Sequence, residues 1–177
     1  MDEREPLQLV SGARVVDSRT AAFDALFREE YAKLVRALAV GAGLEAAADA
    51  VQDAFVQANL HWTRVSTLDS PGAWVRRVAI NRLHNHRRGL RRGDAALAKL
   101  ALPVAAPEPT GLDLDLQRAI AELPERQRLA ICLHYLADLS VAQVADALGV
   151  SAGTIKSNLH DARQALEKRL EVTDHAR

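Results

Sequence analysis

The sequence contains a single cysteine, Cys132, among its 177 residues. One thiol excludes an internal disulfide and cannot supply the several thiolates of a structural zinc site. A signal-peptide pattern is missing as well, and so is any apolar run of about 18 residues, the length that a membrane-spanning helix needs. We therefore expect a soluble cytoplasmic protein that makes no membrane contact, with Cys132 in its core.

Strand signals are equally scarce. Stretches in which valine, isoleucine, threonine or aromatic residues alternate with polar ones are missing, whereas alanine and leucine dominate. The chain has 49% hydrophobic residues and only six prolines, which is typical of a folded protein of one or two small domains. This composition predicts an all-α fold.

The usual signatures of enzymes are missing too. The sequence has no phosphate-binding glycine loop, no nucleophile elbow and no paired-histidine metalloprotease motif. His84 and His86 are two residues apart, a spacing that does not place both side chains on one helix face. We therefore expect no catalytic residue, no cofactor, no metal site and no small-molecule substrate.

Acidic residues are absent from one strongly basic stretch. Residues 70–93 contain seven arginines and no Asp or Glu, whereas residues 1–60 carry ten acids against six bases. The net charge of zero conceals this segregation. Clustered arginines favour phosphate as a ligand, and the alternatives are a solvated helix face or an acidic protein partner.

Helical spacing is clear in the first half of the chain. One pattern begins at Ala21 and is broken by Gly41 and Gly43, and a third helix can begin at Pro71, whose missing N–H costs nothing in a first turn. Between them, a pattern over 45–62 places six apolar residues on one side. These are Ala47, Val51, Ala54, Phe55, Ala58 and Trp62.

A proline- and alanine-rich stretch, 93–111, separates this part from the next. The sequence therefore predicts two small helical domains joined by a flexible linker. The expected organisation is an N-terminal tail (1–19), a first domain (20–92), the linker (93–112), a second domain (113–170) and a C-terminal tail (171–177).

The second domain contains a helix-turn-helix pattern over 139–166. Ser140 and Gln143 have the spacing of a capping box, Gly149 suits the left-handed turn that ends a helix, and Ser151 can cap the next helix. The apolar side of that helix consists of Ile155, Leu159, Ala162 and Leu166. Its other side carries Thr154, Lys156, Ser157, Asn158, His160 and Arg163.

Hydroxyl, amide and cationic side chains are the groups that bond base edges and phosphates when a helix enters the major groove. The polar side of this helix combines all three kinds. The alternative is an ordinary helical hairpin, but the tight turn together with its capping residues favours a DNA-binding motif.

Four segments follow one another in a fixed order. They are AADAVQDAFVQANLHW (47–62), SPGAWVRRVAINRLHNHRR (70–88), ELPERQRLAICLHYLADLS (122–140) and VADALGVSAGTIKSNLHDAR (144–163). Together they resemble the small two-domain sigma factors of bacterial RNA polymerase, the extracytoplasmic-function type. The resemblance covers about residues 20–170. It implies a non-catalytic subunit, acting in the cytoplasm at the nucleoid, that binds core RNA polymerase, directs it to promoters and assists promoter melting.

The resemblance also implies roles for individual residues. A helix face that docks on a coiled coil of the largest polymerase subunit would include Asp49, Gln52, Asp53 and Phe55. The minus-ten element, as duplex and unpaired strand, would be bound by the loop 65–70 and by Arg76, Arg77, Asn81, Arg82, Arg87 and Arg88. The minus-thirty-five element would be read by Thr154, Lys156, Ser157, Asn158, His160 and Arg163.

Some positions depart from the family pattern or have a second interpretation. Ala46 and Ala48 stand where carboxylates are frequent, and Ala50 stands where leucine is usual. Phe55 has the spacing of a core residue as well as a family contact position. Asp161 stands where arginine is common, so its carboxylate either accepts from a cytosine amino group or faces solvent.

Two other functions are compatible with parts of this pattern. A stand-alone helix-turn-helix regulator would use the same reader but would need a ligand, phosphorylation or dimerisation module, which the arginine-rich helix does not resemble. An interaction protein that sequesters regulators would not need the DNA-facing cations. Family members are commonly restrained by an anti-sigma factor, so the resemblance adds one as a candidate partner.

Overall fold

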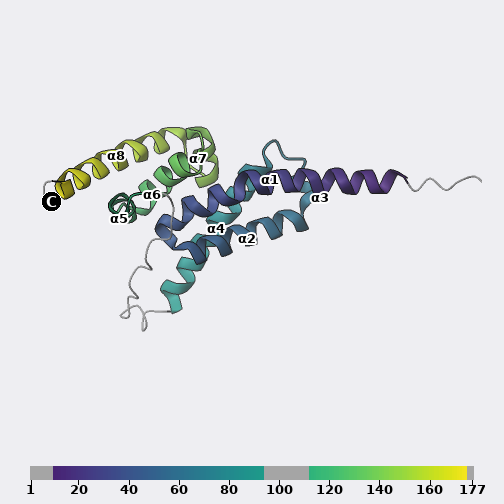
Figure 1. The fold of residues 1–177 in the computed structure, drawn as a ribbon, viewed down its shortest axis with the longest axis horizontal. Coiled ribbons are helices and arrows are strands. Elements are labelled where there is room, and N and C mark those ends of the chain that lie inside the picture. Colours follow the sequence, from purple (N-terminus) through teal and green to yellow (C-terminus); the bar gives the residue numbers. More distant parts are fainter. Residues whose placement is uncertain (1–9, 94–111, 175–177) are drawn as a thin grey trace, which may run out of the picture.

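The computed structural model describes the backbone of residues 10–93 and 112–174 and the side chains of residues 18–85 and 112–171. Within these ranges every regular element is helical, which confirms the all-α fold (Figure 1). Most of the expected linker, residues 94–111, lies outside the described residues. The elements are α1 (Val10–Ala42), α2 (Leu44–Leu60), α3 (Trp62–Val65), α4 (Pro71–Gly93), α5 (Leu114–Ala121), α6 (Glu125–Ile131), η1 (Cys132–Leu136), α7 (Val141–Leu148) and α8 (Ala152–Asp174).

Helix α1 is longer than the sequence pattern predicts, because it begins at Val10 rather than at Ala21. Residues 18–22 are all exposed, so burial does not explain the part of the extension whose side chains are described. Once a helix is nucleated, each further residue adds a hydrogen bond, and the helix can continue beyond its packed part. The end of α1 at Ala42 agrees with the expected break, and Gly43 has a φ of 86°, which glycine adopts without strain.

Five of the seven aromatic side chains gather where α1, α2 and α3 meet. The Phe23 ring stands edge-on to Trp62, with ring centroids 5.2 Å apart, and to Phe55, with centroids 6.1 Å apart. Phe27 and Tyr31 contact the same Phe55 ring from the next turns of α1. This cluster and the alanine-rich side of α2 form the core of the first domain, as the spacing predicts.

The structure confirms the helix caps and the turn predicted for the helix-turn-helix segment. Ser140 Oγ accepts from the Gln143 backbone N–H (3.2 Å), and Gln143 Oε1 accepts from the Ser140 N–H (2.9 Å), which completes the capping box. Gly149 is left-handed, with a φ of 67°. Ser151 Oγ then accepts from the Thr154 N–H (3.1 Å) and caps α8.

The helix expected from Pro124 to about Leu136 does not keep one geometry. It is α-helical to Ile131 and continues as the π-helix η1, whose Ala137 N–H donates to the Cys132 carbonyl. One extra residue per turn is accommodated here, and Asp138 then adopts a φ of 56°. No sequence signal that we recognise predicts this turn.

The two domains pack directly against each other. α1 contacts α2 and α4 on the first-domain side and η1, α5 and α6 on the other, while α4 contacts α7. Figure 1 shows the second domain, in green and yellow, beside the C-terminal half of α1. The buried apolar residues of both domains form one continuous cluster. The sequence predicts two domains but not this shared core.

A buried ion pair joins α1 to α4. Arg76 is 2% exposed and Glu30 is 9% exposed, and Nη1 of Arg76 donates to Oε1 of Glu30. Gly72, one turn before Arg76, leaves room for this pair, because a methyl group there would lie 2.8 Å from Oε1 of Glu30. A buried charge that loses its partner is costly, so the pair fixes the position of α4 against α1.

We expect Glu30→Leu or Arg76→Met alone to lower the free energy of unfolding by about 3–5 kcal/mol, because each leaves one uncompensated buried charge. The double variant removes both charges and should recover most of that loss. Lys33→Met, at an exposed position of α1, serves as the control. Chemical denaturation of the four variants checks this, and equal losses in the single and double variants would contradict it.

Candidate nucleic-acid and protein interfaces

One face of α2 carries three of the four expected polymerase contacts. Asp49, Gln52 and Asp53 are all exposed, and the last two follow Asp49 by three and four residues, which places them on one stripe of the helix. Two large apolar side chains, Val56 (49% exposed) and Leu60 (67% exposed), continue the stripe towards the end of the helix. The face therefore offers carboxylates, an amide and apolar surface together.

The fourth expected contact, Phe55, does not belong to this face. It is 4% exposed and lies inside the aromatic cluster, so Phe55 is a core residue, as its helical spacing also suggested. Its ring cannot contact polymerase directly in this structure. Ala50 is buried on the same side, while Ala46 and Ala48 are partly buried. The three alanines that depart from the family pattern thus bear on packing more than on the exposed stripe.

The arginine-rich helix α4 divides its cations between core and surface. Arg76 pairs with Glu30 in the core, and this corrects the expectation that it contacts DNA, because its guanidinium cannot reach a phosphate from there. The sequence does contain a signal: Arg76 shares one helix side with Ile80 and Leu83, both of which are buried. The number of arginines in the segment does not reveal that one of them lies on the apolar side of the helix.

The neighbouring candidates lie on the outer side of α4. Arg77, Asn81 and Arg82 are exposed, and so are residues 66–70 of the preceding loop. Nη1 of Arg82 is 3.9 Å from Oδ2 of Asp53, so the α4 surface borders the α2 stripe. An ion pair this long and this exposed contributes little to stability. The side chains of Arg87 and Arg88 lie outside the described residues.

Arg77 also contacts the second domain. Its Nη2 and Nε donate to the backbone carbonyl of Asp146, near the end of α7, at 2.6 Å and 3.2 Å. Carbonyls in the last turn of a helix carry partial negative charge and attract cations, and this carbonyl also accepts the Gly149 N–H at 3.4 Å. A residue expected to bind DNA is therefore held by the other domain.

Helix α8, which the sequence predicts to read DNA, has the expected division into two faces. Ile155, Leu159 and Ala162 are buried, and Leu166 follows at 9% exposure. Asn158 is half-buried, and the remaining five candidates on the polar face are exposed. They are Thr154, Lys156, Ser157, His160 and Arg163.

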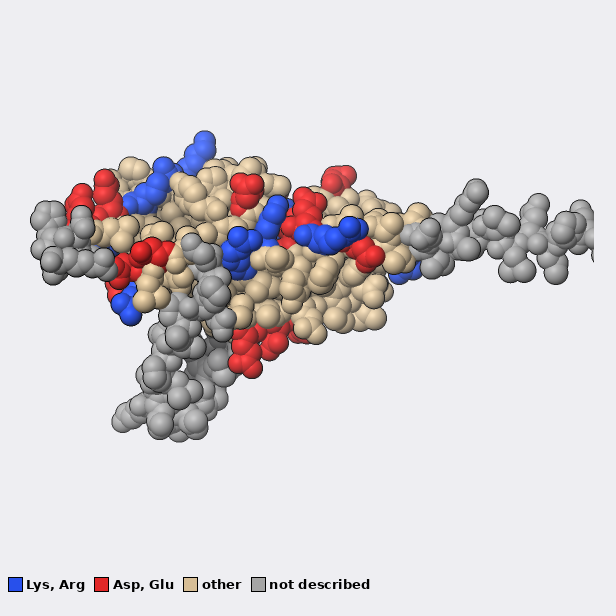
Figure 2. Space-filling model, viewed as in Figure 1, with Lys and Arg blue, Asp and Glu red and all other residues tan. Residues whose placement is uncertain are grey.

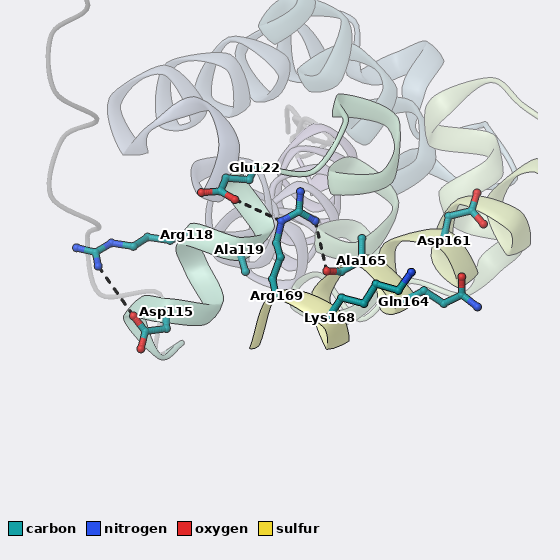
Figure 3. Close-up of a pocket in the computed structure, with 9 residues that line it drawn as sticks. All are labelled: Asp115, Arg118, Ala119, Glu122, Asp161, Gln164, Ala165, Lys168 and Arg169. Carbon is teal, nitrogen blue, oxygen red and sulfur yellow. Dashed lines mark hydrogen bonds and ion pairs between the residues drawn. The ribbon is translucent and has the colours of Figure 1, made fainter. Parts of the chain in front are cut away.

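Asp161 lies at a groove between α5 and α8. The groove has a volume of about 880 Å³, and its lining includes three acids and three bases. Figure 3 shows Arg169 reaching Glu122 across it, with Nε of Arg169 3.3 Å from Oε2 of Glu122. Balanced charges do not select a ligand of one sign. Asp161 is exposed at this groove, which both of its interpretations require.

Charges on the face drawn in Figure 2 are mixed. Blue and red side chains alternate over the described part of the surface, and no uniform basic patch covers it. The segregation along the sequence is reduced by folding, because Arg76 is buried beside Glu30 and Arg82 lies near Asp53. On this face, and among the described residues, cations therefore act as individual side chains rather than as one broad patch.

Cys132 is 1% exposed, as expected for a core residue. Burial raises the pKa of its thiol to about 12, although the nearby Arg128 opposes the shift, so the thiol is neutral and unreactive at pH 7. Across residues 18–85 and 112–171, no three His, Cys, Asp or Glu side chains gather as metal ligands would. None of the described helices is both long and apolar enough to cross a bilayer.

Two family models match the chain in the order that the sequence suggests. "Sigma-70 region 2" matches residues 27–93, and "Sigma-70, region 4" matches residues 113–166. The first range contains α2, α3 and α4 and most of the packed part of α1, and the second contains α5 to α7 and most of α8. Both candidate DNA surfaces thus fall within matched regions, which a stand-alone regulator would not require.

Individual relatives agree with these models. The chain is 32% identical over 172 residues to ECF RNA polymerase sigma factor SigM of Mycobacterium tuberculosis, covering 95% of this chain and 86% of that protein. It is 35% identical over 129 residues to ECF RNA polymerase sigma factor SigF of Caulobacter vibrioides, covering 71% of this chain and 72% of that protein.

A solved structure shares the fold. It is the sigma factor RpoE from Bartonella quintana, in complex with the anti-sigma factor NepR, with a TM-score of 0.68 and 24% identity over 90% of this chain and 98% of that one. The order of the helices, the two family-model matches and the 32% identity over 95% of this chain all indicate the same family. The chain belongs to the ECF sigma factors, the subunits that direct RNA polymerase to promoters.

Proposed function

We propose that this protein docks on core RNA polymerase through the α2 stripe and reads promoters with α4 and α8. The stripe is defined by Asp49, Gln52, Asp53, Val56 and Leu60. The observation that carries the proposal is the division of α8 into a buried apolar side and an exposed side rich in hydrogen-bonding groups. A helix built in this way, preceded by a tight turn, can enter a major groove by its N-terminal half.

The two DNA surfaces would do different work. Exposed cations on α4 neutralise phosphates, and the loop 66–70 can receive a base extruded from the minus-ten element. Unstacking costs a few kcal/mol per base, which binding of the unpaired strand offsets without ATP hydrolysis. Lys156 and Arg163 would hold phosphates of the minus-thirty-five element, while Ser157 and Asn158 read base edges.

The chain itself would be non-catalytic, since RNA synthesis belongs to the polymerase, and it would act in the cytoplasm at the nucleoid, where promoters are. We propose domain boundaries at 20–92 and 113–170, close to the matched regions. An anti-sigma factor is a candidate partner, because the RpoE sigma factor that shares the fold was solved in complex with one.

Run-off transcription tests the function directly. Purified core polymerase is combined with this protein on genomic fragments that include the region upstream of its own gene. We expect transcripts from defined start sites only when the protein is present. Specific duplex binding without initiation, and without co-migration with core polymerase, would instead identify a stand-alone regulator.

Charge reversal on the α2 stripe tests the polymerase contact. We expect Asp49→Lys with Gln52→Ala to weaken binding to core polymerase by roughly tenfold at low salt, since charges at an interface affect association most strongly there. Glu29→Lys, on the exposed side of α1, is the matched control. Equal affinity of the variant and the control, measured by fluorescence anisotropy, would place the docking surface elsewhere.

Arg82 and Asn81 allow a comparison of phosphate contact and base reading. We expect Arg82→Ala to weaken promoter opening on all sequences and to reduce the slope of log affinity against log salt by about 0.7–0.9, the share of one phosphate. Asn81→Ala removes no charge and should leave the slope unchanged while altering promoter preference. Opening assays over a salt series check both, and identical slopes for wild type and Arg82→Ala would exclude the phosphate contact.

A further inference from the structure

Asp161 is the only acidic residue between Ser151, which caps α8, and Leu166. The other polar side chains over this length of the helix are neutral or cationic. An acid here opposes the approach of DNA, because phosphates repel a carboxylate. A carboxylate at this place therefore needs a hydrogen-bond donor on the DNA to offset that repulsion.

Asp161 lies in the row of α8 that points away from the core. With about 100° of rotation per residue, Ser157, Asp161 and Gln164 lie within about 60° of one another. All three are exposed, and they are on the side opposite the buried Ile155 and Leu159. This outer row is the one that enters a DNA groove when α8 reads a promoter, since the opposite side is packed on the domain.

Lys156 and Arg163 lie apart from the outer row. They are seven residues, or nearly two turns, from each other, so both are on one flank of the helix, about a third of a turn away from the row. Long cationic side chains on a flank reach the phosphates at the edge of a groove, whereas the shorter side chains of the row reach base edges. Asp161 therefore belongs to the groups suited to bases.

Asp161 also lies within the length over which a helix can read bases. Thr154, in the first turn of α8, and Asp161 are seven residues apart, which is about 10 Å along the helix axis. The major groove is about 12 Å wide, and the reading residues of a homeodomain helix extend over about eight positions. A groove that accepts the first turn of α8 therefore accepts Asp161 as well.

No partner within the described residues neutralises Asp161. The groove beside it contains two other acids, and each already has a cation: Asp115 pairs with Arg118 (3.9 Å) and Glu122 pairs with Arg169 (3.3 Å). Figure 3 shows both pairs, with the Asp161 carboxylate apart from them at the end of the groove. Its oxygens accept no hydrogen bond and form no ion pair with any described residue, so none of these residues competes with DNA for them.

The major-groove edges of the four bases present different groups to this carboxylate. An ionised carboxylate only accepts hydrogen bonds, so the acceptors N7 and O6 of guanine and O4 of thymine repel it. Adenine offers its N6 amino group next to the acceptor N7, whereas cytosine offers its N4 amino group with no acceptor beside it. Cytosine is therefore the base to which Asp161 is complementary.

We propose that Asp161 is a specificity-determining residue that selects a C·G base pair in the minus-thirty-five element by accepting a hydrogen bond from cytosine N4. The guanine of the same pair presents acceptors, and Ser157 and Gln164, about one turn to either side of Asp161, provide donors for them. This inference rests on the proposed function, since it takes α8 to be the reader of that element.

Selection from random DNA tests the assignment. The complex of core polymerase with the full-length protein is incubated with random duplexes long enough to include both promoter elements, and the bound duplexes are sequenced. We expect the wild-type complex to enrich a motif with a C·G pair that Asp161→Ala no longer selects. Asp161→Asn should select A·T there instead, because an amide accepts from N6 of adenine and donates to its N7. The rest of the motif should stay unchanged.

Affinities for two duplexes that differ only at this pair give the magnitude. We expect the wild-type complex to prefer C·G to T·A by about tenfold, and Asp161→Ala to reduce that preference to about twofold or less, as the loss of one base contact predicts. Glu167→Gln removes one exposed acid from the flank that carries Lys156 and Arg163. It is the matched control and should keep the full preference.

Three results would contradict the assignment, and they differ in what they leave standing. A uniform gain in affinity of Asp161→Ala for all duplexes, with the preference intact, would overturn it, because that result is expected of a carboxylate that only repels phosphates. The same motif in wild type and in both Asp161 variants would overturn it too and leave the proposed function unaffected. Enrichment of no motif by the wild-type complex beyond that of core polymerase alone would contradict the proposed function itself, and with it the role of Asp161.

Discussion

Helix α1 is the element on which the rest of the structure depends, because both domains are packed against it. Glu30 on one side holds Arg76 of α4, and Gly41 near its end lies beneath Arg128 of the second domain. Most of the stability of a helix in a protein comes from tertiary packing of its apolar side. For α1 this packing is provided by α2, α4 and η1. The buried ion pair adds position rather than net stability, since two apolar residues could fill the same space.

This arrangement explains how one short chain offers several surfaces. The aromatic cluster and the Glu30–Arg76 pair occupy the inner sides of α2 and α4. Exposed side chains remain on the outer sides, where Arg77 also contacts α7. The nearness of Asp53 to Arg82 places the proposed polymerase surface beside the proposed minus-ten surface. Docking on polymerase would then bring the DNA strand to the same edge of the domain.

Local signals predicted most of the fold, and they failed where tertiary contacts decide. The capping box at Ser140, the turn at Gly149 and the apolar side of α2 require only neighbouring residues, so the sequence was sufficient for them. The pairing of Arg76 with a residue 46 positions away is not a local property, and the same arginine looks like a DNA contact when charges are counted along the chain. The π-helix η1 and the packing between the domains likewise depend on contacts that no periodicity contains. Phe55 was ambiguous for a related reason, because helical spacing describes both a core residue and the edge of an exposed stripe.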